Sequence, residues 1–213
     1  MASVDTGEIG RLLKPFAKLD EERLSHTSTY IDLLLKWNAR INLTAVRDAQ
    51  EMVTRHFGES FFVAGIFRDN VPATLIDLGS GAGFPGIPIA MLLPETQITL
   101  IEANQKKVTF LREVIFALKL KNISVFAGRG EEYRQQADVV AMRAVERFDQ
   151  SLSVAMTLVE QRGRLALMIG ASQVRDAHTL GPEMEWSDAM AIPGGHSRVL
   201  LVGIKKAKVE RNH

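Results

Sequence analysis

Cysteine is absent from all 213 residues of the chain, which excludes disulfide bonds, thiolate metal sites and a thiol nucleophile. No apolar run approaches the roughly 20 residues that span a bilayer, and the first residues contain neither a basic patch nor an apolar stretch. The five histidines show no metal-ligand spacing, and the formal net charge is only +1. We therefore expect a cytoplasmic protein with neither a metal nor a membrane partner. The small net charge does not by itself indicate a nucleic-acid-binding protein.

The first seventy residues carry the periodicity of helices. Apolar residues from Leu24 to Leu35 recur at spacings of three and four, and Asp20 is placed to cap this helix. Asp48–Glu51 has the pattern of a capping box and predicts a second helix that runs through His56 and Phe61. We predict that residues 1–70 form a helical cap, with a seam to the rest of the chain at Asp69–Pro72.

From Thr74 onward, short apolar strands alternate with helical segments, which indicates an α/β fold. Residues 71–213 are predicted to form a mostly parallel sheet whose last strand is antiparallel, in one compact unit with the cap. The strands are expected at Thr74–Leu78, Gln97–Glu102, Ile123–Ala127, Val139–Ala141, Arg164–Ile169 and Ser197–Gly203, and the helices at Pro85–Leu93, Gln105–Leu118 and Gln150–Val159.

A glycine-rich loop follows the first predicted strand. Residues without a Cβ atom let the backbone turn tightly and let a ligand approach the main chain. The run Gly81–Gly86 also matches the G-x-G-x-x-G pattern of dinucleotide-binding proteins, so the loop alone leaves a nicotinamide cofactor and S-adenosylmethionine both open. The loop residues expected at the cofactor are Gly79, Ser80, Gly81, Gly83 and Phe84.

Two carboxylates flank this loop and distinguish the cofactors. The carboxylate of Asp77 would be repelled by the pyrophosphate of a dinucleotide but would attract the cationic sulfonium and ammonium groups of S-adenosylmethionine. Glu102 ends the second strand, at a position where either cofactor presents its ribose hydroxyls. Taken singly, Asp77 fits a turn or helix cap, and Glu102 fits a solvated strand end. Together they favour S-adenosylmethionine on a Rossmann-like class I methyltransferase sheet, with Ala103 beside Glu102 at the cofactor.

A third segment, Gly128–Glu132, follows the third predicted strand. Its backbone N–H groups and a carboxylate suit an adenine edge, and Gly130 and Glu131 are expected to border the adenine. An acidic helix start is the competing interpretation of the same residues.

These residues carry a resemblance to a known family. The segment Trp37-Asn38-Ala39-Arg40-Ile41-Asn42-Leu43-Thr44-Ala45-Val46-Arg47-Asp48, then His56, then Asp77 to Pro88, resembles the RsmG family, also called glucose-inhibited division protein B. The match runs from about Leu33 to Lys205. It implies a bacterial enzyme that methylates N7 of a guanosine in small-subunit (16S) ribosomal RNA, with naked rRNA or the 30S particle as its partner, and we expect a monomer.

The residues agree with methylation at N7. This nitrogen has an in-plane lone pair and no proton to remove, so the reaction needs positioning more than a general base. Methylation at C5 of a pyrimidine needs a cysteine that the chain lacks. Methyltransferases of exocyclic amines typically carry an Asn/Asp-Pro-Pro-aromatic tetrad after the fourth strand, where this chain has Ala141-Met142-Arg143-Ala144.

The resemblance also assigns substrate residues. Arg143 matches an arginine at the end of the fourth strand and is the leading candidate for the catalytic site, for the substrate and for the cofactor edge. Arg129 and Arg198 match further family arginines, and a guanidinium fork suits phosphate or the O6/N7 edge of guanine. His56 matches a family histidine and is expected as a secondary contact. Surface ion pairs, and packing for His56, are the competing interpretations.

The chain departs from the family pattern at two positions. Ile169 stands where the family often has a lysine, and Glu59 where it often has aspartate. The first departure removes a cation that could bind phosphate. Three alternatives stay open: a methyltransferase of a small molecule, a nicotinamide-dependent oxidoreductase that Asp77 disfavours, and a non-catalytic RNA-binding module.

Overall fold

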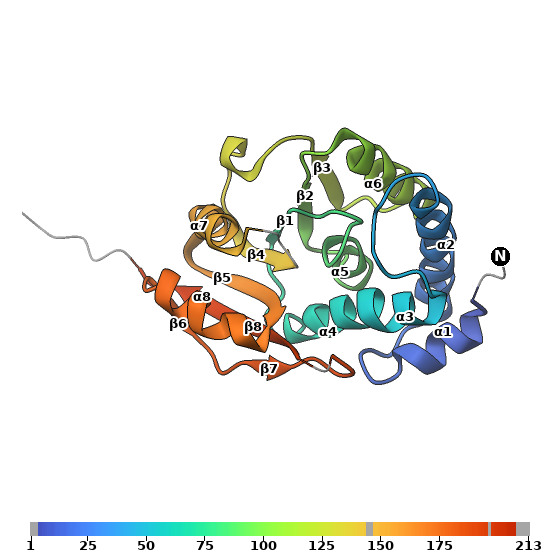
Figure 1. Ribbon diagram of the computed structural model, residues 1–213, viewed down its shortest axis with the longest axis horizontal. Helices are drawn as coiled ribbons and strands as arrows, with labels where there is room; N and C mark the ends of the chain where they lie inside the picture. The colour runs from blue at the N-terminus through green and yellow to red at the C-terminus, as the bar shows by residue number, and fades with distance from the viewer. Residues whose placement is uncertain (1–3, 144–146, 196, 208–213) are drawn as a thin grey trace, which may run out of the picture.

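The computed structural model describes residues 4–143, 147–195 and 197–207 (Figure 1). Helices occupy the N-terminal third, and strands alternate with helices after it. The helices of the first third are α1 Thr6–Leu13, α2 Glu21–Asn38, α3 Ala49–Met52, the π-helix η1 Val53–Gly58, and α4 Glu59–Ile66. The later helices are α5 Gly86–Leu92, α6 Gln105–Ala117, the 3-10 turns η2 Gly130–Glu132 and η3 Ala171–Gln173, α7 Phe148–Leu158 and α8 Val174–Leu180.

The strands form one eight-stranded sheet in the order β3-β2-β1-β4-β5-β8-β6, with β7 paired to β8. Strands β3 through β5 are parallel, and β8 runs antiparallel to β5, which confirms the predicted sheet. The order reverses between β1 and β4, which is where open α/β sheets bind ligands at their carboxyl edge. The strands are β1 Thr74–Leu78, β2 Gln97–Ile101, β3 Ile123–Phe126, β4 Ala137–Arg143, β5 Val159–Gly170, β6 Met184–Trp186, β7 Met190–Ala191 and β8 Arg198–Lys205.

Two hydrophobic cores cover the two faces of the sheet. Because side chains alternate along a strand, Leu75 belongs to the core under α5 and α6, whereas Ile76 and Leu78 belong to the core under α7 and α8. Figure 1 shows these helix pairs on opposite sides of the strands. The first core also contains buried cap residues such as Tyr30 and Phe57, so the cap and the sheet share it. The division at residue 70 stays a prediction.

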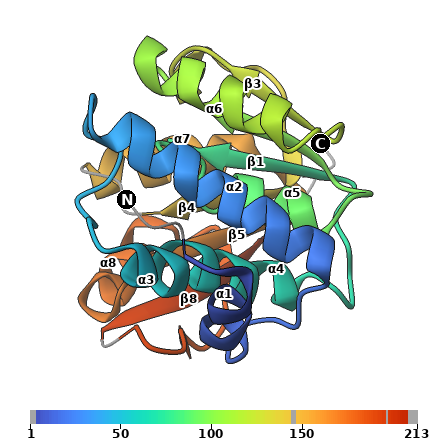
Figure 2. The same ribbon diagram turned by 90° about the vertical axis from the view of Figure 1, so that its right-hand side faces the viewer.

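The cap lies across the α5–α6 face. Asp20 accepts a hydrogen bond from Arg23 N and Asp48 accepts one from Glu51 N, which confirms both predicted helix starts. Figure 2 shows α2 running across α5 beside α6. The second cap helix differs from the expectation, because a π-helical turn interrupts it at Val53–Gly58, and this turn carries His56.

The C-terminal third also differs from the expectation. Strand β5 begins at Val159 rather than Arg164, since the polar residues before Gly163 remain in the strand although Arg162 has a φ of 63°. Strands β6 and β7 and helix α8 were not predicted, because they are short and carry little periodicity. Within the described ranges, no helix has the length and apolarity that a bilayer crossing requires.

Candidate functional site

A hollow of about 470 Å³ opens at the carboxyl edge of the sheet, beside the switch point between β1 and β4. We call it the cofactor hollow. Strand ends β1 and β2, the loop after β3, and helix α7 supply its walls. Six of the predicted site residues line it: Gly79, Glu102, Ala103, Arg129, Gly130 and Glu131. Among the described residues, its lining does not include Asp77, Ser80, Gly81, Gly83, Phe84, Arg143, His56 or Arg198.

The glycine loop adopts backbone conformations that other residues rarely take. Gly81 has a φ of 58° and Gly83 a φ of 88°, both in the left-handed region. A Cβ atom on Gly81 would meet only Gly79 O at 3.8 Å, so this side of the loop is open, whereas one on Gly83 would lie 2.6 Å from Ile87 Cδ1. The loop is therefore closed against α5 at Gly83 and accessible to a ligand at Gly81.

Glu102 is the carboxylate that the structure brings to this loop. Its Oε2 accepts a hydrogen bond from Gly81 N at 2.8 Å, and its Oε1 accepts one from Asn104 N at 2.8 Å. The side chain is buried at the end of β2 and lines the cofactor hollow. Each carboxylate oxygen has a second lone pair, so both oxygens retain acceptor capacity for a pair of ligand hydroxyls.

The segment after β3 forms the opposite wall. A Cβ atom on Gly130 would lie 2.6 Å from Leu78 Cδ1 and 2.8 Å from Val154 Cγ1, so only glycine fits where η2 meets the sheet and α7. The exposed side chains of Arg129 and Glu131 border the hollow beside this apolar patch. A flat heterocycle that packs against this apolar patch would have the polar side chains of Arg129 and Glu131 at its edge.

Asp77 lies elsewhere than its charge suggested. It is fully buried and faces α5, where its Oδ2 accepts a hydrogen bond from Gly86 N at 2.9 Å. Burial raises the pKa of this carboxyl group from 3.8 to about 7. Asp77 therefore supports the start of α5 behind the glycine loop, as the competing helix-capping interpretation describes.

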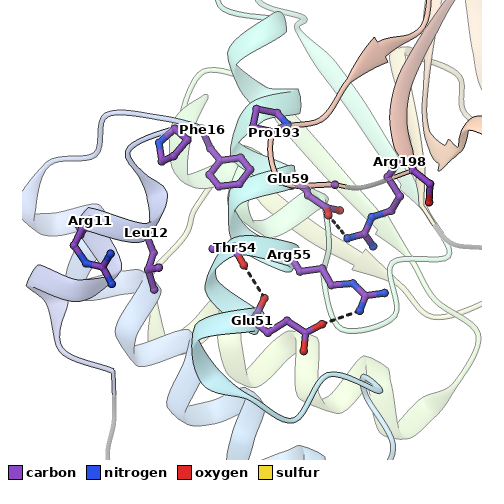
Figure 3. Close-up of a pocket in the computed structure, with 13 residues that line it drawn as sticks. Arg11, Leu12, Phe16, Glu51, Thr54, Arg55, Glu59, Pro193 and Arg198 are labelled. Carbon is purple, nitrogen blue, oxygen red and sulfur yellow. Dashed lines mark hydrogen bonds and ion pairs between the residues drawn. The ribbon is translucent and has the colours of Figure 1, made fainter.

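A largely buried cluster of polar and charged side chains lies beside the loop. We call His56, Glu59, Arg143 and Arg198 the arginine cluster. Glu59 forms an ion pair with Arg143, whose Nη2 lies 3.4 Å from Oε2. It forms a second ion pair with Arg198, which donates to Oε1, as Figure 3 shows. Glu59 and Arg143 are almost fully buried, and Arg143 Nη1 has no hydrogen-bond partner within the described part of the chain. Burial raises the pKa of Glu59 and lowers that of Arg143 to about 10.

The π-helix positions Arg143 through His56. Arg143 Nη2 donates to Arg55 O at 2.8 Å and lies 3.0 Å from His56 Nδ1. Since arginine only donates, His56 Nδ1 accepts, and the proton on Nε2 is directed at Thr44 Oγ1, 2.7 Å away. Burial and the nearby arginines lower the pKa of His56 to about 3, so its ring is neutral at physiological pH.

The polar segment after α2 holds this arrangement in place. Asn38 Oδ1 accepts hydrogen bonds from Leu43 N at 2.9 Å and Thr44 N at 3.1 Å. Asn38 Nδ2 donates to Thr44 O at 3.1 Å. The turn therefore presents the Thr44 hydroxyl to His56, and His56 in turn orients Arg143. This is the structural reason for asparagine and threonine in the Trp37–Thr44 motif.

Phe84 connects the arginine cluster to the glycine loop. The His56 ring stacks on Phe84 with centroids 4.9 Å apart, and the Arg143 guanidinium lies 6.0 Å from the Phe84 centroid. Tyr30 stacks on Phe84 at 5.2 Å, and its hydroxyl donates to Ala82 O. Tyr30 was not predicted from the sequence, because it is one of several buried positions on α2.

The two positions that depart from the family pattern lie in different settings. Ile169 is buried in the core under α7 and α8, so this side chain faces away from the arginine cluster's face of the sheet. Its neighbour Gly170 pairs with Arg198 across β5 and β8, which places a guanidinium at the same strand end. Glu59 takes part in both ion pairs of the arginine cluster.

Comparisons with known proteins show the family and the fold of the chain. The profile of the family described as rRNA small subunit methyltransferase G matches residues 23–195. A protein named ribosomal RNA small subunit methyltransferase G from Chloroflexus aggregans is 37% identical over 202 residues, covering 89% of this chain and 84% of its own. Its namesake from Roseiflexus sp. is 36% identical over 203 residues, covering 89% and 86%. The fold resembles a ribosomal protein L11 methylase from Lactobacillus delbrueckii with a TM-score of 0.59 and 12% identity, covering 72% of this chain and 79% of that one.

Proposed function

This chain belongs to the rRNA small subunit methyltransferase G family, and we propose that it transfers a methyl group from S-adenosylmethionine to N7 of a guanosine in small-subunit (16S) ribosomal RNA. The observation that carries the proposal is the fixed carboxylate of Glu102 on the open side of the glycine loop, at the sheet's switch point. The names of its relatives indicate ribosomal RNA of the small subunit as the substrate, and the arginine cluster beside the loop supports an anionic substrate.

The residues of the cofactor hollow fit S-adenosylmethionine, which supplies an electrophilic methyl group on a sulfonium sulfur. Glu102 would accept hydrogen bonds from the ribose hydroxyls, and Ala103 would border the ribose. Gly130 and Glu131 would border the adenine, with Leu78 and Val154 against its face. Gly79, Ser80, Gly81, Gly83 and Phe84 would shape the loop around the methionine moiety. Asp77 would act through the loop that it anchors to α5.

The arginine cluster suits a reaction that needs no base. His56 Nδ1 already accepts from Arg143, and its pKa of about 3 leaves it without a proton to donate beyond Thr44. Guanine N7 attacks with its in-plane lone pair, so the protein's task is to align this nitrogen with the methyl group and to exclude water. Arg143, at the end of β4 and over Phe84 of the glycine loop, is the residue that we assign to the substrate.

The remaining arginines would hold the RNA backbone. Arg129 borders the cofactor hollow with an exposed side chain, and Arg198 is partly exposed at the start of β8. Both can form bidentate contacts with phosphate. We propose that the protein acts as a monomer in the cytoplasm on 16S rRNA, naked or within the 30S particle.

Incubation with labelled S-adenosylmethionine and small-subunit particles that lack the modification tests the proposal. We expect label at one guanosine, at a position where aniline cleaves the RNA after reduction, and we expect the variant Glu102→Ala to incorporate none. Particles that already carry the modification are the matched control. Label in a pyrimidine, or label only in small metabolites, would contradict the proposal.

A further inference from the structure

A second and larger hollow lies on the other side of the arginine cluster. It measures about 750 Å³ and is formed by α1, the α3–η1–α4 segment and the loop between β7 and β8. We call it the cap hollow. Arg11, Phe16, Arg55, Pro193 and Arg198 contribute to its lining (Figure 3). In the described part of the chain, it shares no lining residue with the cofactor hollow.

Three guanidinium groups border the cap hollow, against the carboxylates of Glu51 and Glu59. Glu59 is compensated by Arg143 from behind, because Arg143 pairs with it but does not line the hollow. Arg55 pairs with Glu51 at 2.8 Å, and both side chains are about half exposed, so this pair is weak and exchangeable. The balance of charge in the cap hollow is therefore positive and favours an anionic ligand. The planar guanidinium groups of arginine can form two parallel hydrogen bonds with a phosphate.

Arg11 adds the most exposed of these groups. Its side chain is 70% exposed, and its ion pair with Glu8 is long at 3.7 Å. Glu8 also accepts a hydrogen bond from Gln50 at 2.6 Å, which divides its charge between two partners. Arg11 is therefore available to a ligand at small cost.

An apolar wall lies beside Arg11 and across the hollow from Arg55 and Arg198 (Figure 3). Phe16 is half-buried, and its ring rests on Gly58, where a Cβ atom would lie 2.7 Å from Phe16 Cε2. Leu12 and Pro15 extend the wall, and Pro193 lies at its upper rim (Figure 3). A fixed aromatic ring beside arginines is the combination that stacks a nucleobase while its phosphate is neutralised.

The arginine cluster separates the two hollows and also connects them. Glu59 lines the cap hollow and pairs with Arg143, and Arg143 lies over Phe84 of the glycine loop. A nucleoside in the cap hollow is thus kept from the cofactor hollow by buried side chains, and its own atoms are not the methyl acceptor. Its phosphate on Arg198 would nevertheless be held at a fixed place relative to the loop, since Arg198 is anchored by Glu59.

We propose that the cap hollow binds a nucleotide of the RNA substrate that flanks the methylated guanosine. The base lies against Phe16, and Arg11, Arg55 and Arg198 hold its phosphate. This inference rests on the proposed function, because it takes RNA as the substrate. It adds Arg11, Phe16 and Arg55 to the binding surface.

The double variant Arg11→Ala/Arg55→Ala tests the charge contribution. We expect KM for unmethylated small-subunit particles to rise about tenfold with kcat and the Kd of S-adenosylmethionine within twofold of wild type. The slope of log Kd for the particle against log salt should fall by about one, because Arg11 and Arg55 would act on the same phosphate. Arg112→Ala, which removes an exposed arginine on α6, is the matched control and should leave all four values unchanged.

Phe16→Leu tests the stacking contribution, because it keeps an apolar side chain against Gly58 but removes the ring face. We expect Kd for the particle to rise about fivefold with an unchanged salt slope. Thermal unfolding of each variant verifies the fold, and a variant that keeps the wild-type Tm and the wild-type particle Kd would overturn the inference.

Titration of wild-type protein with GMP and AMP separates RNA from a free nucleotide. We expect millimolar or weaker binding of either mononucleotide. Micromolar binding that Arg11→Ala/Arg55→Ala abolishes, with particle affinity unchanged, would assign the hollow to a free nucleotide and overturn the inference. The Kd of the particle is measured without methyl transfer. The binding measurements on the variants therefore test the cap hollow even if the labelling experiment contradicts the proposed function. Normal labelling with unchanged Kd in the variants would overturn the inference alone.

Discussion

The cofactor hollow and the arginine cluster are built by different means. Backbone groups dominate the hollow and the glycine loop beside it: left-handed glycines, and the amides of Gly81 and Asn104 that donate to the carboxylate of Glu102. The arginine cluster consists of side chains from the π-helix, α4, the end of β4 and the start of β8, and its paired residues Glu59 and Arg198 lie 139 positions apart in the sequence. The first is specified locally along the chain, and the second exists only after the cap has docked on the sheet. The two regions should therefore respond differently to substitution.

The largest expected effect is on stability, at Arg143→Ala. Removing this side chain leaves Glu59 buried with Arg198 as its remaining ion-pair partner among the described residues, and loss of one member of a buried pair costs about 3 kcal/mol or more. We expect urea unfolding to show a loss of that order, with the Kd of S-adenosylmethionine within threefold of wild type. Arg143→Lys should recover part of the stability. A stability equal to wild type would contradict the account of the cluster.

The next effect concerns cofactor affinity, at Glu102→Ala. The substitution removes the acceptor of two backbone amides and of the ribose hydroxyls, and hydrogen bonds to a charged group contribute about 1.5–3 kcal/mol each. We expect the Kd of S-adenosylmethionine, measured calorimetrically, to rise about 100-fold. Glu102→Gln should fall between the two, because its amide oxygen still accepts. A Kd within threefold of wild type for Glu102→Ala would remove the ribose assignment.

A smaller effect follows from the buried carboxyl group of Asp77, whose folded-state pKa of about 7 exceeds its ordinary 3.8. The folded state binds this proton more tightly, so the contribution of Asp77 to the free energy of unfolding is fully present below about pH 4 and is lost as pH rises through 7. The slope is on the order of 1 kcal/mol for each pH unit. Asp77→Asn keeps an acceptor for Gly86 N and removes this dependence. Parallel pH-stability curves for wild type and variant would contradict the assignment.

The smallest expected effect is that the rate of methyl transfer does not depend on the protonation of His56. Because His56 has a pKa of about 3 and N7 carries no proton, kcat for methyl transfer should show no inflection between pH 6 and pH 8 in an Asp77→Asn background, which removes the buried carboxyl group that titrates near pH 7. Single-turnover rates on small-subunit particles across this range measure it. An inflection near pH 6.5 that His56→Asn abolishes would show that the histidine takes part in proton transfer.

The sequence predicted the locally specified parts well. The strands β1 to β4, the glycine loop and the antiparallel last strand follow from periodicity and glycine spacing, and the structure confirms them. The orientation of Asp77 was also encoded, since its neighbours Ile76 and Leu78 share one core and Asp77 must face the other side of β1. Its charge invited a cofactor contact, but strand alternation directs it toward α5.

The parts that depend on tertiary contacts were not predicted. The π-helix, the ion pairs of Glu59 and the Tyr30–Phe84 stack require the cap to lie on the sheet, and no local pattern specifies that docking. Asn38 fixes the turn that presents Thr44 to His56, and the contact between Thr44 and His56 was not predicted. The short strands β6 and β7 are held by pairing with β8 rather than by their own propensity. The roles of the individual site residues stay predictions.

The affinity of Glu102→Ala for small-subunit particles in the absence of S-adenosylmethionine tests most directly whether the two regions divide the work. If the cofactor hollow and the arginine cluster act separately, the particle Kd of this variant equals that of wild type although methyl transfer is lost. A particle Kd raised tenfold or more, in a variant that keeps the wild-type Tm, would contradict that division.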